Sequence, residues 1–342
     1  MNAVTALFFA AEETTEAVQI DPIVTEFSNM KVPVLSMVMM GLGSVILLAA
    51  IVAGVYFLFD RTDNWGMGLL AGLASYMIFC FLIFSGIQIG LNALPFTKDF
   101  VQNKPQQFTA MMTIFSGILS CLSVFLALKY VESQMAKRGQ MMTIGVPLAI
   151  GIGMFLGSVL SNRQIMSGFQ YIMVSSSVNK MGFDAAVTAT VQSMVESGYE
   201  LEEAKKTAID SLYSMMSEPS ASFFLNSFYF VVMGVLETSL AVLLFGEMTD
   251  RTEKKWTFIG YGGLMLATVP SLLNSLTSFP SWAGVLVTLA IAAAVGFFTV
   301  RQAGQDMPEE LNTLSYSHRK NKGGGKGDGQ KKKMPHIVMP DK

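Results

Sequence analysis

The sequence predicts an all-α membrane protein, a polytopic bundle of seven transmembrane helices. Hydrophobic residues make up 51% of the chain and charged residues only 14%, whereas soluble domains carry roughly a quarter charged residues. Seven stretches are apolar over about the 20 residues that a helix needs to cross the hydrocarbon core. Because lipid offers no hydrogen-bond partner to an open backbone, we expect these stretches to be helices rather than strands.

The predicted spans follow one another through short connections, except for one long connection between the fourth and the fifth. In chain order they cover residues 32–59, 66–94, 108–130, 141–160, 220–245, 256–274 and 282–300. We therefore divide the chain into an N-terminal segment (1–31), a membrane domain (32–302) and a C-terminal tail (303–342).

The placement of lysine and arginine predicts the orientation, because cytoplasmic loops carry an excess of both. Seven spans put the two chain ends on opposite sides. With the C-terminus inside, sixteen of the 23 basic residues fall in cytoplasmic segments. We therefore expect the N-terminus outside, with segment 1–31 as an acidic, solvated outer segment. Its apolar start lacks the basic leading region of a signal peptide, so no cleavage is expected.

Two short helices are predicted within the long connection, over residues 183–217. Apolar residues recur there at the three- and four-residue spacing of a helix face, and Gly198 between them is a typical helix end. These residues are Phe183, Val187, Val191, Met194 and Val195 in the first helix, and Leu201, Ala208, Leu212 and Met215 in the second. We expect an outer helical hairpin that serves either as a lid or docking platform or simply as a cap over the bundle.

The tail over residues 303–342 is predicted to be a disordered, basic, cytoplasmic segment. It holds the glycine run 323–325 and the lysine run 331–333, which favour a flexible, positively charged chain. Such a run can contact anionic lipid, at about 1 kcal/mol per residue, or it can anchor the orientation of the last span. The sequence does not choose between these two roles.

Glu237 is the clear case of an ionisable side chain inside a predicted span. It lies near the middle of the fifth span, which holds no Lys, Arg or His. Burying a carboxyl group at that depth costs at least a few kcal/mol, and burial favours the neutral form, which can donate one hydrogen bond. Glu237 is therefore a candidate for a proton relay or a substrate-contacting acid. The alternative is an interhelical hydrogen bond that holds the bundle together.

Other side chains in the spans are interpreted as packing groups. Glycines recur four residues apart at 68 and 72, 86 and 90, and 153 and 157, a spacing that lets helix backbones approach closely and predicts a tight bundle rather than a pore. Cys80 and Cys121 fit no metal or redox motif, and the 25 methionines form no ligand face. No cofactor and no nucleic acid partner is expected. The expected partners are the lipid bilayer and another membrane protein.

The order and character of the segments over residues 32–300 carry a family resemblance. The third span ends in the stretch Ala127–Tyr130 with its lysine, the fourth has glycines on either side of one residue, and a helical pair precedes the fifth. In these features the chain resembles the YhfC family of intramembrane metalloproteases, in a wider group with the CAAX-type proteases and the scaffold subunit of γ-secretase. The resemblance implies the helix arrangement of that family and a multi-pass location in a bacterial plasma membrane.

The resemblance also implies where the metal ligands of the family would lie, and other residues occupy those positions. The family's glutamate pair falls on Ser120 and Cys121, and its histidine with a following glutamate falls on Ile152 and Leu156. Glu237 stands where a second family histidine is expected. The chain's two histidines, His318 and His336, are both in the tail, and Gly151, Gly153 and Gly157 are expected to serve helix packing. Since a catalytic zinc needs about three protein ligands, we expect no metal site.

Three functional hypotheses follow from the sequence. The first is a non-catalytic, pseudoprotease-like scaffold or binding subunit for another membrane protein or segment. The second is a small-solute or proton-coupled transport component that uses Glu237. The third is a membrane-embedded hydrolase, for which Glu237 alone shows neither a partner base nor a nucleophile.

Overall fold

The computed structural model describes residues 31–62, 64–94, 97, 100, 103–217, 220–277 and 280–315. Every regular element within these residues is a helix. Nearly all of the predicted N-terminal segment lies outside the described residues. So does the tail from residue 316, including His318 and His336.

Seven helical stretches in the described part are long and apolar enough to cross a membrane, which confirms the predicted seven-span, all-α class. They cover Val34–Arg61, Trp65–Leu91, Pro105–Lys137, Gly145–Met181, Phe223–Met248, Lys254–Asn274 and Trp282–Asp306. Large apolar side chains point away from the protein along them, and Leu35 and Phe258 are each 72% exposed. A surface of this kind fits a lipid bilayer, so the chain has the pattern of a multi-pass membrane protein.

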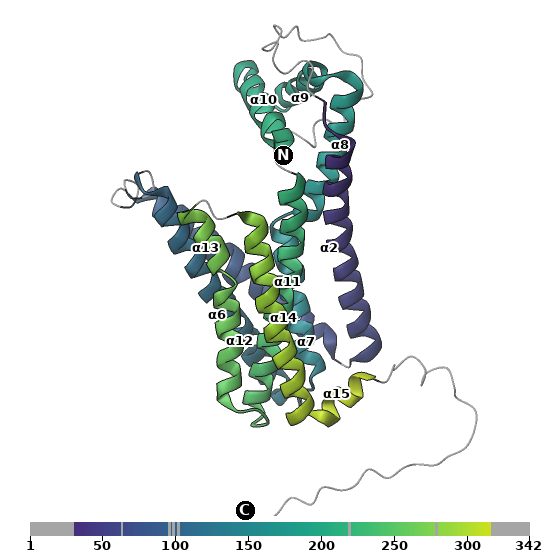
Figure 1. Cartoon of the computed structure of the whole chain (residues 1–342), viewed down its shortest axis with the longest axis vertical. Coiled ribbons are helices and arrows are strands. Elements are labelled where there is room, and N and C mark those ends of the chain that lie inside the picture. Colours follow the sequence, from purple (N-terminus) through teal and green to yellow (C-terminus); the bar gives the residue numbers. More distant parts are fainter. Residues whose placement is uncertain are drawn as a thin grey trace, which may run out of the picture.

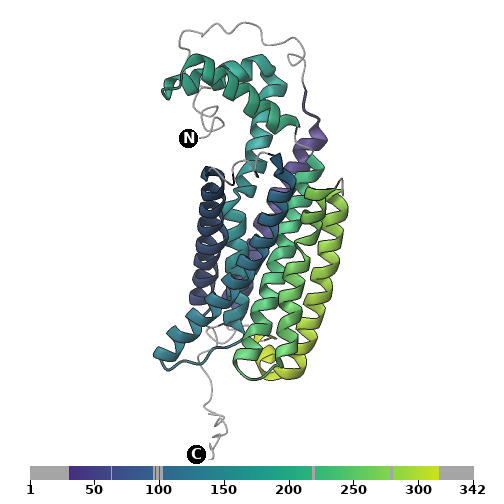
Figure 2. The ribbon, with the colours of Figure 1, turned by 90° about the vertical axis from the view of Figure 1, so that its left-hand side faces the viewer.

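The helices form a bundle with a head at one end (Figure 1). In chain order they are α2 (Val34–Arg61), α3 (Trp65–Ser75), η1 (Tyr76–Ile83), α4 (Phe84–Ala93), α6 (Pro105–Lys137), α7 (Gly145–Ser161), α8 (Gln164–Met181), α9 (Phe183–Glu196), α10 (Leu201–Ser217), α11 (Ser220–Met248), α12 (Lys254–Leu266), α13 (Val269–Leu276), α14 (Ser281–Asp306) and α15 (Pro308–Ser315). The head comprises α9, α10 and the C-terminal part of α8, and α15 lies at the opposite end of the molecule. Figure 2 shows the green to yellow helices α11 to α14 side by side on one side of the bundle.

The fourth span differs from its prediction. It was expected to be short, over residues 141–160, but the helical stretch runs over 37 residues from Gly145 to Met181. Arg163 adopts a left-handed conformation (φ 50°) between α7 and α8. The chain stays helical beyond it because Tyr171, Val174 and Val178 form a buried face at helical spacing, and α2 extends far enough to pack along α8.

Two spans are irregular. The second contains a π-helix, η1, between α3 and α4, and π-helical turns inside α-helices are frequent at functional sites. The sixth is interrupted at Ala267 and Thr268, and Pro270 follows in the first turn of α13. Proline lacks the N–H that a continuous helix would use, so a new helix starts there.

Most of the buried apolar side chains belong to two hydrophobic cores, and a smaller third cluster surrounds Leu47, Phe155 and Val159. The larger core lies within the bundle and includes Val124, Met154, Leu236 and Phe245. The second joins α8, α9 and α10 to the first half of α2 and the start of α11. Most of the described residues on the predicted apolar faces of α9 and α10 are buried in this second core, for example Val187 and Leu212, whereas Leu201 is exposed.

The described chain remains helical past residue 302, the predicted end of the membrane domain. Helix α14 continues to Asp306, and α15 follows directly after Met307. Leu311 and Leu314 of α15 pack against the main core. The ordered helical part therefore reaches Ser315.

Close helix contacts in the bundle depend on some of the predicted glycines. A Cβ atom on Gly153 would overlap the Leu69 backbone carbonyl, and one on Gly72 would overlap the Ile150 carbonyl. These contacts let α3 and α7 approach closely. By contrast, Gly86 and Gly90 have no neighbouring atoms within 4 Å of an added Cβ.

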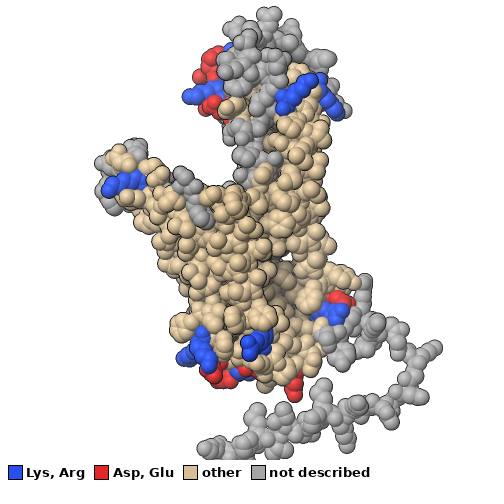
Figure 3. Space-filling view, viewed as in Figure 1, with Lys and Arg blue, Asp and Glu red and all other residues tan. Residues whose placement is uncertain are grey.

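Charged side chains gather at the two ends of the molecule, and the face in Figure 3 shows an uncharged band between them. A band of this kind is suited to contact with the hydrocarbon of a bilayer.

Candidate functional site

Glu237 lies inside the bundle, carried by the central helix α11. This helix packs against α2, α6, α7, α12 and α14. Glu237 is 2% exposed, and its Oε2 atom has no hydrogen-bond partner among the described residues. A buried carboxyl oxygen without a partner is costly, so this position calls for a structural or functional explanation.

A polar cavity of about 420 Å³ adjoins Glu237. Its walls come from the second span (Tyr76, Cys80, Phe81, Phe84, Ser85 and Gln88), α6 (Ser116 and Ser120), α7 (Ser158, Ser161 and Asn162) and α11 (Tyr229, Phe230, Met233 and Glu237). Hydroxyl, amide and phenol groups therefore line a space at the depth of the membrane spans. Lining of this kind is expensive in hydrocarbon and marks pathways or binding sites for polar species.

The cavity extends from Glu237 toward the end of the bundle that carries the head. On α7 its lining runs from Ser158 to Asn162, at the C-terminal end of the helix, and on α11 from Glu237 back to Tyr229. Gln88, near the end of α4, is exposed. Glu237 thus lies at the deep end of the cavity.

Local backbone structure positions the cavity walls. The π-helix η1 presents Tyr76, Cys80 and Phe81 to the cavity. Gly157 makes room for Tyr76, because an added Cβ would lie 3.0 Å from the Cβ of Tyr76. Each of these features brings the second span close to α7 while leaving space beside Glu237.

Small polar groups join the second span to α6 next to the cavity. The Ser75 Oγ lies 2.7 Å from both the carbonyl oxygen and the Oγ of Ser123. The Cys80 Sγ lies 3.6 Å from the Ser120 Oγ. Since buried polar groups need partners, these contacts fix the wall that faces Glu237.

Several hydroxyl groups of the cavity donate their protons to their own helices. Ser158 Oγ donates to the Phe155 carbonyl (2.8 Å), Ser161 Oγ to the Ser158 carbonyl (3.1 Å) and Ser116 Oγ to the Thr113 carbonyl (2.7 Å). A hydroxyl whose proton is committed still has lone pairs that accept. The Asn162 amide nitrogen likewise donates to the Ser158 carbonyl at 2.8 Å. These three hydroxyl groups therefore face the cavity as acceptors.

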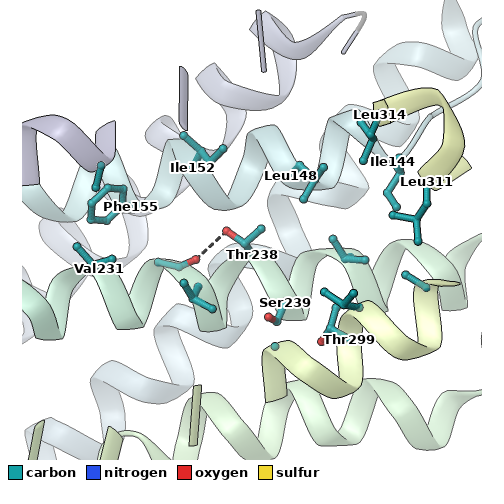
Figure 4. A pocket seen from close by; sticks show the side chains of 17 residues that line it. Ile144, Leu148, Ile152, Phe155, Val231, Thr238, Ser239, Thr299, Leu311 and Leu314 are labelled. Atoms are coloured by element: carbon teal, nitrogen blue, oxygen red, sulfur yellow. Dashed lines mark hydrogen bonds between the residues drawn. The ribbon is translucent and has the colours of Figure 1, made fainter. Parts of the chain in front are cut away.

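A second, apolar cavity of about 390 Å³ lies on a different face of α7 and α11. Figure 4 shows Ile152 and Phe155 of α7, Thr238 and Ser239 of α11, and Leu311 of α15 around it. The Thr238 hydroxyl donates to the Gly234 carbonyl of its own helix at 2.7 Å, the dashed line in Figure 4. This cavity thus offers little polar chemistry.

Only some of the positions that the family resemblance singles out are brought together. Ser120 shares the polar cavity with Glu237, but Ile152 lines the apolar cavity. Cys121 packs against the main core, and Leu156 is partly buried. Gly151 sits where α7 crosses α11, since an added Cβ would overlap Thr238. Among the described residues, no three His, Cys, Asp or Glu side chains form a group that could hold a metal ion.

Comparisons with protein-family models, with curated proteins and with solved structures give no match. The functional argument therefore depends on the geometry of the site.

Sequence reasoning found Glu237 but missed the cavity around it. The missing signal is the spacing of polar residues inside apolar spans. Ser116 and Ser120 are four residues apart on α6, and Ser158 and Asn162 are four apart on α7, so each pair shares a helix face. On α11, Tyr229 lies eight residues before Glu237, and both side chains line the cavity.

Proposed function

We propose that the protein is a small-solute-binding component of membrane transport, in which Glu237 contacts a solute or carries a proton. The observation behind this proposal is the partnerless carboxyl oxygen of Glu237 at the deep end of a polar cavity. Intramembrane carboxyl groups of transporters commonly relay protons or contact substrates. The π-helix in the second span beside the cavity supports the proposal, because π-helical turns inside α-helices are frequent at functional sites.

The proposal includes the orientation and the location predicted from the sequence. With the N-terminus outside and the C-terminus inside, the polar cavity opens toward the outer face, and α9 and α10 form an outer helical hairpin. The distribution of Lys and Arg supports this orientation. The location would be a plasma membrane, and the family resemblance favours a bacterial one.

A flux measurement tests the transport proposal. The full-length protein is reconstituted into liposomes that contain a pH-sensitive dye, and proton flux is followed under an imposed pH gradient with and without candidate solutes outside. We expect a flux above that of empty liposomes that Glu237→Gln abolishes. Glu247→Gln, on the same helix but outside the cavity, should leave it unchanged. A flux equal to that of empty liposomes, together with no solute binding, would refute the proposal.

A second proposal is the non-catalytic, pseudoprotease-like scaffold that binds another membrane protein or segment. It is supported by the resemblance to the intramembrane metalloproteases and by the residues at the family's ligand positions, Ser120, Cys121, Ile152 and Leu156. Gentle detergent extraction of the full-length protein, followed by mass spectrometry of what co-purifies, tests it. A single stoichiometric membrane partner is expected, and a protein that purifies alone argues against the scaffold.

A further inference from the structure

We propose that the ligand of the Glu237 cavity is a small primary or secondary ammonium ion, held by the Glu237 carboxylate and by neighbouring acceptor oxygens. This inference rests on the proposed solute-binding function and names its substrate class. It is carried by three properties of the cavity: its charge, its hydrogen-bonding groups and its aromatic walls.

The charge of the cavity favours a cation. Glu237 is the sole Asp, Glu, Lys, Arg or His among the lining residues that the structure describes. A carboxylate without a counter-ion at this depth is strongly disfavoured, and a bound cation would supply the missing charge. An anion would instead meet like charge whenever Glu237 is ionised.

The hydrogen-bonding groups favour a ligand that donates. The protons of Ser116, Ser158 and Ser161 are committed to carbonyls of their own helices, and the unpartnered Glu237 Oε2 is an acceptor when ionised. A primary ammonium group carries three N–H donors and no acceptor. It therefore complements this set of oxygens, whereas a ligand rich in acceptors would leave them unpaired.

The aromatic walls also suit a cation. Tyr76, Phe81, Phe84, Tyr229 and Phe230 all line the cavity. The face of an aromatic ring attracts a cation, and more strongly when both are desolvated. The same rings would cover the apolar part of an organic amine. A volume of about 420 Å³ admits an organic amine of modest size.

A comparison of three probes on the full-length protein in detergent micelles tests the inference. Benzylammonium has both charge and N–H donors, benzyl alcohol is its neutral analogue, and benzyltrimethylammonium has the charge without N–H donors. Binding is measured by saturation-transfer NMR, with empty micelles as the blank. We expect benzylammonium to bind at least about tenfold more tightly than either of the other two. Glu237→Gln should remove that preference, and Glu247→Gln should keep it.

The probe comparison on the wild-type protein tests the ammonium assignment even if Glu237→Gln fails to fold. Equal binding of benzyl alcohol and benzylammonium would overturn the ammonium assignment and leave solute binding standing. Equal binding of benzyltrimethylammonium would overturn the role of N–H donation. If no probe binds and no solute elicits flux, the proposed function fails together with the inference.

Discussion

Glu310 of α15 and Arg251, in the turn between α11 and α12, form an ion pair in which Arg251 Nη1 lies 2.6 Å from Glu310 Oε1. The other carboxylate oxygen, Oε2, accepts a hydrogen bond from the Ile144 backbone N–H, just before α7, at 3.0 Å. One carboxylate thus ties α15 to two separate parts of the bundle. Arg61 Nη1 adds a third tie by donating to the Leu314 carbonyl at 3.2 Å. These contacts hold Leu311 and Leu314 against the apolar cavity.

Removing the Glu310 carboxylate should therefore destabilise the protein more than removing its arginine partner. We expect Glu310→Ala to lower the free energy of unfolding by about 1–3 kcal/mol, because it leaves the Ile144 N–H without its charged acceptor. Arg251→Ala should cost about 0–1 kcal/mol, because the Arg251 side chain is 41% exposed and solvent screens the pair. Thermal unfolding of both variants in the same detergent measures the difference. Equal losses would show that the backbone contact contributes little.

The side chain of Asn179 on α8 should hold the start of α2. The Val32 N–H donates to Asn179 Oδ1, and Asn179 Nδ2 donates to the Val32 carbonyl, both at 2.9 Å. We expect Asn179→Ala to raise the hydrogen-exchange rate of the Val32 amide by at least about tenfold, at a cost of about 1–2 kcal/mol. Ser177→Ala is the matched control, because Ser177 donates to the Met173 carbonyl of its own helix. Faster exchange at Val32 in the control as well would point to a general loosening of α8 instead.

The close crossing of α3 and α7 should make Gly153 intolerant of a side chain. An added Cβ would overlap the Leu69 carbonyl and lie 2.9 Å from the Leu73 nitrogen, and a backbone atom cannot move aside cheaply. We expect Gly153→Ala to destabilise the protein by about 1–3 kcal/mol. Gly86→Ala should be neutral or stabilising by up to about 1 kcal/mol, because open space surrounds Gly86 and alanine favours the helix. Matching melting temperatures for the two variants would contradict the packing assignment.

The elements that the sequence predicts well are those with a strong local signal. The seven spans follow from uninterrupted apolar length, and Glu237 stands out because it is a carboxyl group near the middle of a span without Lys, Arg or His. Helix α8 was missed because Ser, Gln and Asn interrupt its apolar face, which becomes recognisable only once α2 is known to lie beside it.

The π-helix and the polar cavity could not be predicted from the sequence. The eight residues of η1 are almost uniformly apolar and contain no glycine or proline to mark a change of helix type. The cavity brings together Tyr76, Ser120, Asn162 and Glu237 from four spans. Their proximity depends on how the helices cross, and helical spacing within one span does not specify that.

The orientation in the membrane can be tested with single cysteines at opposite ends of the bundle. Gln140, between α6 and α7, and Glu200, between α9 and α10, are both exposed. In a background with Cys80 and Cys121 replaced by alanine, a membrane-impermeant maleimide applied to intact cells should label Glu200→Cys. It should label Gln140→Cys only after permeabilisation, because positively charged loops stay in the cytoplasm.

The reverse labelling pattern would show that the protein has the opposite orientation, with the Glu237 cavity open toward the cytoplasm. Labelling of both positions in intact cells would mean that the protein adopts two orientations. In either case a solute would have to be supplied on the side to which the labelled Glu200→Cys is exposed, because the cavity extends toward the end of the bundle that carries α9 and α10.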